Sequence, residues 1–166
     1  MSFKDIDAFL EAEGAPASRV DVERPHVLVV DDDPTIRVSF AALLQKRYQL
    51  ILCSSAKEGV NAMSEDVCVA ILDIKMGKHD GFWACNQIRK KYPDLPVIFY
   101  SAYQDAKDPY DIINEHRPFG YITKSGNTTQ LVNAVDLAVD FYRRFLDGKR
   151  LLDSYKQHRR KGGGSF

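Results

Sequence analysis

The middle of the chain alternates short apolar runs with longer segments of helical period, and this alternation limits the possible folds more than any other feature. Between the runs, apolar residues recur at spacings of three and four, as in Ile36, Phe40, Leu43 and Leu44, which is typical of a helix with one buried face. The pattern predicts five strands that alternate with five helices. The runs are rich in β-branched residues and read HVLVV (26–30), YQLILC (48–53), VCVAIL (67–72), PVIFY (96–100) and FGYIT (119–123).

The predicted strands are apolar without interruption, as in VLVV (27–30) and VAIL (69–72). Strands of this kind are covered on both faces, which favours a parallel sheet between two layers of helices, a doubly wound α/β fold. A chain of 166 residues with 45% hydrophobic content can form one such core. In this architecture, functional sites form beyond the carboxyl ends of the strands.

Composition excludes several classes of protein. The 23 basic and 23 acidic side chains cancel, so no overall field attracts nucleic acid or an anionic membrane. The three cysteines, Cys53, Cys68 and Cys85, are isolated in sequence and indicate neither a disulfide framework nor a zinc site. We expect them to be reduced core residues. No apolar run approaches the roughly 18 residues needed to span a bilayer, and the acidic N-terminal stretch lacks the features of a secretion signal, so we expect a cytoplasmic location.

Four predicted strands end in a polar group, which places these groups at one edge of the sheet. A cluster of carboxylates at one spot is tolerable if a divalent cation neutralises it, and an all-oxygen shell suits Mg²⁺. The residues are Asp31 and Asp32 after the first strand, Asp73 after the third, Ser101 after the fourth and Lys124 after the fifth.

Each of these residues also has an alternative interpretation. Asp33, before Pro34, is placed to cap the following helix rather than to bind a metal. Asp73 could simply start a turn, but beside a metal ion it could attack phosphorus and form an aspartyl phosphate. Ser101 could be a loop residue and Lys124 a solvated lysine, whereas together they could hold two phosphoryl oxygens.

From about His26 to about Tyr142 the chain resembles the receiver (CheY-like) domain of bacterial two-component response regulators. Four stretches carry the resemblance in order, namely VLVVDDDPTIR, VAILDIKMGKHDG, LPVIFYSAYQD and FGYITKSG. The resemblance implies a flavodoxin-like fold with the last helix extended here. It also implies that Asp73 accepts a phosphoryl group from a histidine kinase or a histidine phosphotransfer protein.

The resemblance implies further roles at the site. Asp31, Asp32 and Asp73, with the backbone carbonyl of Lys75, would hold Mg²⁺. Ser101 and Tyr121 would move together as a switch after phosphorylation, while Ser101 and Lys124 assist transfer. Such a protein is not a turnover enzyme, because its chemistry is limited to autocatalytic phosphoryl transfer and autodephosphorylation.

The chain departs from the family pattern at two positions. Ser125 replaces the proline that usually follows the lysine in a cis peptide bond, and a non-proline cis bond costs about 3 kcal/mol. The sequence leaves a cis and a trans bond open there, and a trans bond would aim Lys124 less firmly. Gly77 replaces a proline that is common four residues after the acceptor, which predicts a more mobile loop. Two large side chains, Lys75 and Tyr103, are expected at the pocket mouth, where they would screen an acyl phosphate from water and prolong its lifetime.

Two other functions fit part of the sequence. Asp31, Asp33 and Thr35 match the D-x-D-x-T pattern of haloacid-dehalogenase-like phosphatases, with Asp31 as nucleophile, but no acidic pair follows Lys124 at a strand end. The second alternative is a receiver-like interaction module without phosphoryl turnover. Mapping the acid-labile adduct to Asp73 or to Asp31 would separate the receiver from the phosphatase.

We expect three segments along the chain. Residues 1–25 form an extension with a short amphipathic helix, in which Phe3, Ile6, Phe9 and Leu10 share one side, and a linker. Residues 26–142 form the receiver domain, and residues 143–166 form a helical extension and glycine-rich tail, where Gly148 is expected to break the helix into two. Apolar residues beyond Tyr142 indicate a homodimer, an output domain or the N-terminal stretch as partner. No nucleic-acid reader is recognisable, and we expect no membrane contact.

Overall fold

The five predicted strands are all present and form one parallel sheet in the computed structural model, which describes residues 24–102 and 108–162, with side chains up to residue 160. The N-terminal amphipathic stretch and the glycine-rich tail lie outside the described residues. The sheet has the order β2-β1-β3-β4-β5, which confirms the predicted doubly wound fold. The strands are β1 (His26–Val30), β2 (Gln49–Cys53), β3 (Val67–Leu72), β4 (Val97–Ser101) and β5 (Gly120–Thr123).

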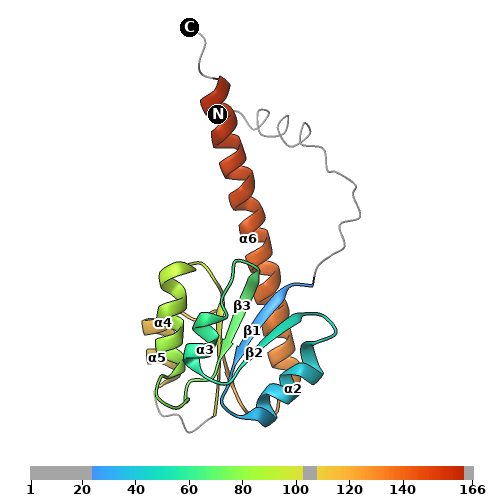
Figure 1. The fold of residues 1–166 in the computed structure, drawn as a ribbon, viewed down its shortest axis with the longest axis vertical. Coiled ribbons are helices and arrows are strands. Elements are labelled where there is room, and N and C mark those ends of the chain that lie inside the picture. Colours follow the sequence, from blue (N-terminus) through green and yellow to red (C-terminus); the bar gives the residue numbers. More distant parts are fainter. Residues whose placement is uncertain (1–23, 103–107, 163–166) are drawn as a thin grey trace.

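Helices cover both faces of the sheet (Figure 1). On one face α2 packs against α6, and on the other α3, α4 and α5 lie side by side. This arrangement buries both faces of the central strands, as their uninterrupted apolar sequence predicts. The helices are α2 (Pro34–Leu44), α3 (Ala56–Asn61), α4 (Gly81–Lys91), α5 (Pro109–His116) and α6 (Thr128–Gly162).

Side-chain caps fix where the helices begin. Asp33 caps α2, since its carboxylate accepts a hydrogen bond from the backbone N–H of Thr35 at 2.8 Å, and this confirms the capping role predicted for it. Asp80 caps α4 by accepting from the backbone N–H of Trp83. Asn127 caps α6 by accepting from Gln130 at 3.1 Å. Each cap satisfies a backbone donor that the first turn leaves unpaired.

The core lies on both sides of β1, β3 and β4. All six residues of β3 are buried, and Phe40 and Phe99 are among the largest fully buried side chains. Cys53, Cys68 and Cys85 are free and buried, which confirms the prediction of reduced core cysteines. Burial raises the pKa of the Cys53 thiol to about 11, so this thiol stays protonated near neutral pH.

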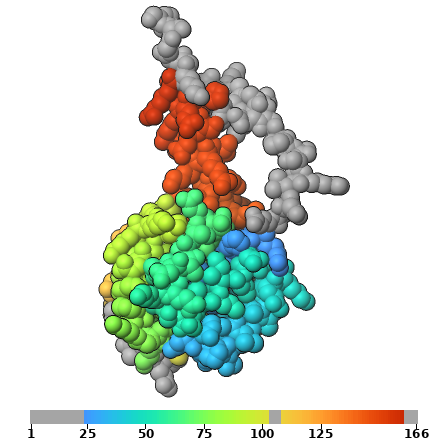
Figure 2. Space-filling model, in the orientation of Figure 1, coloured from blue at the N-terminus to red at the C-terminus, as the bar shows by residue number. Residues whose placement is uncertain are grey.

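The last helix is one continuous helix of 35 residues, and its second half projects away from the body of the domain (Figures 1 and 2). The prediction that Gly148 breaks this helix is wrong. A single glycine inside a helix costs only about 1 kcal/mol relative to alanine, and good helix formers such as Leu146 and Arg150 surround it. Within residues 24–102 and 108–162, none of the helices combines the length and apolar character needed to cross a bilayer.

Candidate functional site

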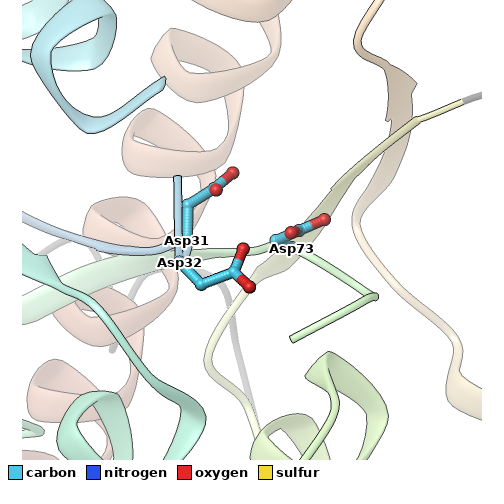
Figure 3. Close-up of side chains that lie close together, drawn as sticks. All are labelled: Asp31, Asp32 and Asp73. Carbon is cyan, nitrogen blue, oxygen red and sulfur yellow. The ribbon is translucent and has the colours of Figure 1, made fainter. Parts of the chain in front are cut away.

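Three carboxylates gather where β1 and β3 end (Figure 3). Asp31 and Asp32 follow β1 directly, and Asp73 follows β3. One ligand oxygen from each residue lies within 4.8 Å of the others. Asp31 and Asp73 are 1% and 4% exposed, respectively, whereas Asp32 is exposed to solvent. The structure therefore brings together the three aspartates that the sequence singled out.

Hydrogen bonds along the sheet fix the backbone of this cluster. The backbone N–H of Asp73 donates to Val30 at 2.9 Å, and that of Asp31 donates to Cys53 at 3.1 Å. These bonds continue the parallel ladder beyond the strands, so the two aspartates take their places from the register of β1 with its neighbours. One oxygen of Asp31, Oδ1, accepts the backbone N–H of Asp33 at 2.9 Å and is held toward the loop.

The ammonium group of Lys124 lies between the two buried carboxylates. Its Nζ is 2.8 Å from Oδ2 of Asp31 and 3.2 Å from Oδ1 of Asp73. The side chain of Lys124 is 17% exposed, so these ion pairs are well shielded from solvent. Lys124 thereby partly compensates the repulsion between Asp31 and Asp73.

Burial and neighbouring charges raise the pKa values of both Asp73 and Lys124. Burial, reinforced by the charge of Asp31, raises the pKa of Asp73 to about 6, although Lys124 opposes the rise. Burial works against the charged form of Lys124, but hydrogen bonding and attraction to Asp31 and Asp73 outweigh it, and the pKa of Lys124 is raised. The cluster therefore pairs a charged lysine with a carboxyl of Asp73 whose ionised form is disfavoured, mainly by burial.

The donor set fits a hard divalent cation. Within the described part of the chain, Lys124 is the one polar side chain that contacts Oδ2 of Asp31 and Oδ1 of Asp73, through ion pairs. These buried oxygens, with a carboxylate oxygen of Asp32, retain the capacity to bind a metal ion. Carboxylate oxygens are the ligands that Mg²⁺ prefers, and it usually keeps several waters. Lys75, whose backbone carbonyl was predicted to be a further ligand, lies in the loop that follows Asp73, with its side chain exposed.

Of the remaining predicted residues, Ser101 lies at the same edge of the sheet, whereas Tyr121 lies within β5. Ser101 ends β4 and is fully buried, and its hydroxyl donates to the backbone carbonyl of Ala102 at 3.2 Å. Tyr121 is half-buried on β5, where it pairs with Phe99 of β4. Tyr103, predicted to lie at the pocket mouth, is outside the described residues.

The peptide bond between Lys124 and Ser125 is trans, since no cis bond occurs among the described residues. The backbone N–H of Lys124 donates to the carbonyl of Ser101 at 2.7 Å, and that of Ser125 donates to Thr123 at 2.7 Å. These bonds fix the exit of β5 without the usual proline. With this trans bond and without a following proline, Lys124 still contacts both Asp31 and Asp73.

Two residues that the sequence did not single out support the site. A guanidinium nitrogen of Arg37 donates to the backbone carbonyl of Asp31 at 2.6 Å, which ties α2 to the acidic loop. Gly81 begins α4 directly against the backbone of Asp73, at the end of β3. A Cβ at this position would lie 2.1 Å from the backbone carbonyl oxygen of Asp73. The arginine within VLVVDDDPTIR was a usable signal, but the close approach of Gly81 was not visible in the sequence.

A hollow of about 360 Å³ opens beside Asp32. It lies between the loop that follows β2 and the loop that follows Asp73. Lys57 and Lys78 border it and give the approach to the carboxylates two positive charges. Its lining includes Asp32, Ser54, Ser55, Lys57, Met76, Gly77, Lys78 and His79.

Comparison with known proteins assigns the family. The family profile of the response regulator receiver domain matches residues 27–136, which is well over half of the chain. The chain belongs to the response regulator receiver family. A solved response regulator receiver domain protein from Clostridium thermocellum is 26% identical, with a TM-score of 0.66, and the match covers 72% of this chain and 98% of that one. The strand order and the acidic cluster agree with this assignment.

Curated relatives contain the receiver as one part of a longer chain. The transcriptional regulatory protein GlrR of Escherichia coli K12 is 29% identical over 117 residues, which are 69% of this chain and 26% of GlrR. The sensor kinase CckA of Brucella abortus is 28% identical over 113 residues, 66% of this chain and 12% of CckA. The chain thus spans about a quarter or less of these relatives.

The geometry also bears on the phosphatase alternative, which needs further acids near the lysine. The first acid after Lys124, Asp136, accepts a hydrogen bond from Tyr48 and forms an ion pair with Arg47. Asp136 is therefore engaged at the turn between α2 and β2. Asp140, the next acid, is exposed on α6.

Proposed function

We propose that this receiver accepts a phosphoryl group on Asp73 from a phosphohistidine donor, either a histidine kinase or a histidine phosphotransfer protein. The observation that carries the proposal is the position of Lys124 between Asp31 and Asp73. A cation at that point can pair with a phosphoryl oxygen once Asp73 carries an acyl phosphate, and the two carboxylates already lie on either side of a positive charge.

In the proposed transfer, a carboxylate oxygen of Asp73 attacks phosphorus and the bond between phosphorus and the imidazole nitrogen of the donor breaks. The freed imidazole takes up a proton. Mg²⁺ held by Asp31, Asp32 and Asp73, with the carbonyl of Lys75, would supply charge neutralisation for the phosphoryl oxygens. Lys124 holds a phosphoryl oxygen, and the hydroxyl of Ser101 donates to another. The cationic hollow beside Asp32 offers a way in for the anionic donor group.

Phosphorylation then acts as a switch in this proposal. Ser101 of β4 moves toward the phosphoryl group, and Tyr121 of β5 moves with it. This movement changes the surface formed by α5 and β5. Loss of the signal is hydrolysis, in which a water oxygen attacks phosphorus, the bond to Asp73 breaks and inorganic phosphate leaves. The protein acts as a phosphorylated signalling component rather than a turnover enzyme, and we propose the cytoplasm, where receivers usually act, as its location.

The domain boundaries and partners are part of the same proposal. We assign residues 26–142 to the receiver, residues 1–25 to an N-terminal extension and residues 143–166 to a helical extension and tail. Kinases or phosphotransfer proteins are the proposed donors. The extended α6 is the proposed element through which a homodimer or an output domain is contacted.

Incubation with acetyl phosphate and Mg²⁺, followed by intact mass measurement and peptide mapping, tests the proposal. We expect one phosphoryl group on Asp73 of the parent protein and none on the Asp73→Asn variant. We also expect no phosphoryl group to form when Mg²⁺ is chelated before acetyl phosphate is added. An adduct on Asp31 would indicate phosphatase-like chemistry instead. A properly folded protein that gains no mass would reject phosphoryl acceptance and favour an interaction module. Size-exclusion chromatography with and without beryllofluoride would show whether modification alters assembly.

A further inference from the structure

The projecting half of α6 carries an apolar stripe that the receiver body borders only at its start, where Phe145 lines a hollow together with Tyr92 and Asp94. Phe145, Gly148, Leu152 and Tyr155 follow one another at spacings of three, four and three residues, which places them on one face of the helix. Phe145 is 36% exposed and Leu152 is 52% exposed. A Cβ on Gly148 would meet no atom within 4 Å, so the stripe contains a notch into which a bulky side chain could fit.

The same half of α6 is strongly basic. Residues 143–160 contain seven arginines and lysines against two aspartates. Lys149 and Lys156 directly follow Gly148 and Tyr155, so they border the stripe. Pairing of this stripe with α6 of a second copy would place like charges beside one another, which opposes association. The charge favours an acidic amphipathic partner.

The N-terminal segment of this chain has that chemistry. Residues 2–13 carry four carboxylates and one lysine, opposite in sign to the helix. Phe3, Ile6 and Leu10 are spaced by three and four residues, the spacing of one apolar helix face. Apolar side chains flanked by carboxylates match apolar side chains flanked by lysines and arginines.

The first described residues lie close to the start of the projecting half of α6. Arg24 and Pro25 line a small pocket together with Arg143, the residue at which the projecting half of α6 starts. The ten residues from 14 to 23 can span roughly 33 Å when extended. The helix from residue 143 to residue 160 rises only about 26 Å. The N-terminal segment can therefore reach every part of the stripe in the same molecule.

We propose that residues 2–13 dock, within the same chain, on the apolar and basic stripe of α6 between Phe145 and Tyr155. Phe3, Ile6 and Leu10 pack on the stripe, and the carboxylates of the segment pair with the bordering lysines. This interaction is independent of the phosphoryl chemistry proposed above, because none of its residues belongs to the acidic cluster. It would make the exposed half of α6 unavailable to other proteins while the segment is bound.

Amide hydrogen exchange of residues 143–160 in the full chain tests the docking. Substituting Phe3→Ser, Ile6→Ser and Leu10→Ser together should accelerate exchange of these amides by about fivefold or more, because local opening becomes easier when the cover is lost. The matched control, Ala8→Ser with Ala12→Ser, changes residues outside the proposed apolar face and should leave exchange unchanged. Exchange that is equal in the apolar variant and the parent would overturn the proposal.

Substitutions that reverse the charges on the two segments give a second, independent test. Asp7→Lys with Glu11→Lys should accelerate exchange of the same amides, and adding Lys149→Glu with Lys156→Glu should restore the protection. Protection should also be independent of protein concentration over roughly a hundredfold range, with a monomeric mass in sedimentation. Failure of the charge swap to restore protection, or protection that grows with concentration alongside a dimeric mass, would contradict docking within one chain.

Discussion

The ammonium nitrogen of Lys124 lies 2.8 Å from Oδ2 of Asp31 and, at the same time, 3.2 Å from Asp73. Asp31 and Asp73 follow neighbouring strands, β1 and β3, whereas Lys124 follows β5 at the edge of the sheet. The long lysine side chain therefore crosses the end of β4 to reach them. The two ion pairs of Lys124 thus connect the ends of β1, β3 and β5.

Replacing Lys124 by methionine should reveal what the cation contributes. Two buried carboxylates would remain without a counter-charge, so we expect the free energy of unfolding in the absence of Mg²⁺ to fall by about 2–4 kcal/mol. Mg²⁺ should stabilise Lys124→Met more than the parent, because the ion then replaces the missing charge. Urea denaturation with and without Mg²⁺ measures both effects. Lys124→Arg, which keeps the charge, is the control, and equal Mg²⁺ dependence in all three proteins would contradict this account.

Replacing Asp73 by asparagine should stabilise the metal-free fold near neutral pH. An acid whose pKa is raised on folding, here to about 6, binds its proton more tightly in the folded state. Stability is then lost as pH rises from the ordinary value of 3.8 through about 6. We expect Asp73→Asn to gain roughly 1–3 kcal/mol in free energy of unfolding above pH 6 and almost nothing near pH 4.

Urea denaturation of Asp73→Asn at several pH values without Mg²⁺ tests this dependence. Asp32→Asn is the matched control, because Asp32 belongs to the same cluster but is exposed, and its effect should be smaller. A stability difference between Asp73→Asn and the parent that stays constant from pH 4 to pH 7 would show that the charge is not the cause.

Gly81→Ala should displace the backbone at the end of β3. The new Cβ would lie 2.1 Å from the carbonyl oxygen of Asp73 and 2.9 Å from its carbonyl carbon, so α4 or the end of β3 must move. We expect a loss of about 1–3 kcal/mol in stability and slower phosphoryl uptake from acetyl phosphate. Gly77→Ala, where a Cβ meets nothing within 4 Å, should change stability by less than about 0.5 kcal/mol. If both variants behave alike in thermal denaturation, the close contact has no consequence.

The lifetime of the phosphorylated form depends, in our prediction, on the two large side chains expected at the pocket mouth. Lys75→Ala combined with Tyr103→Ala should shorten the lifetime by about threefold to tenfold, which corresponds to about 1 kcal/mol of barrier. Loss of phosphate after removal of the donor measures the rate. Lys78→Ala, an exposed lysine in the same loop, is the control. Fast loss that the double substitution does not alter would reject screening of water.

Local sequence patterns were sufficient to predict the five strands and to single out the residues that gather at the ends of the strands. Uninterrupted apolar runs mark strands buried on both faces, and the residues that end them must lie at one sheet edge because parallel strands share a direction. Asp31, Asp73 and Lys124 could be named on that basis. The continuity of α6 through Gly148 could not be predicted, because a glycine at this point costs little compared with the propensity of the residues around it.

The sequence by itself determined that this chain forms a doubly wound parallel sheet with acidic, hydroxyl and ammonium groups at its carboxyl edge. The tertiary structure alone decided that Lys124 lies between Asp31 and Asp73, that Gly81 lies against the backbone of Asp73, and that α6 continues unbroken through Gly148. Periodicity is a property of neighbouring residues. Distances between side chains depend instead on strand order, register and helix packing, which bring together residues far apart in the chain.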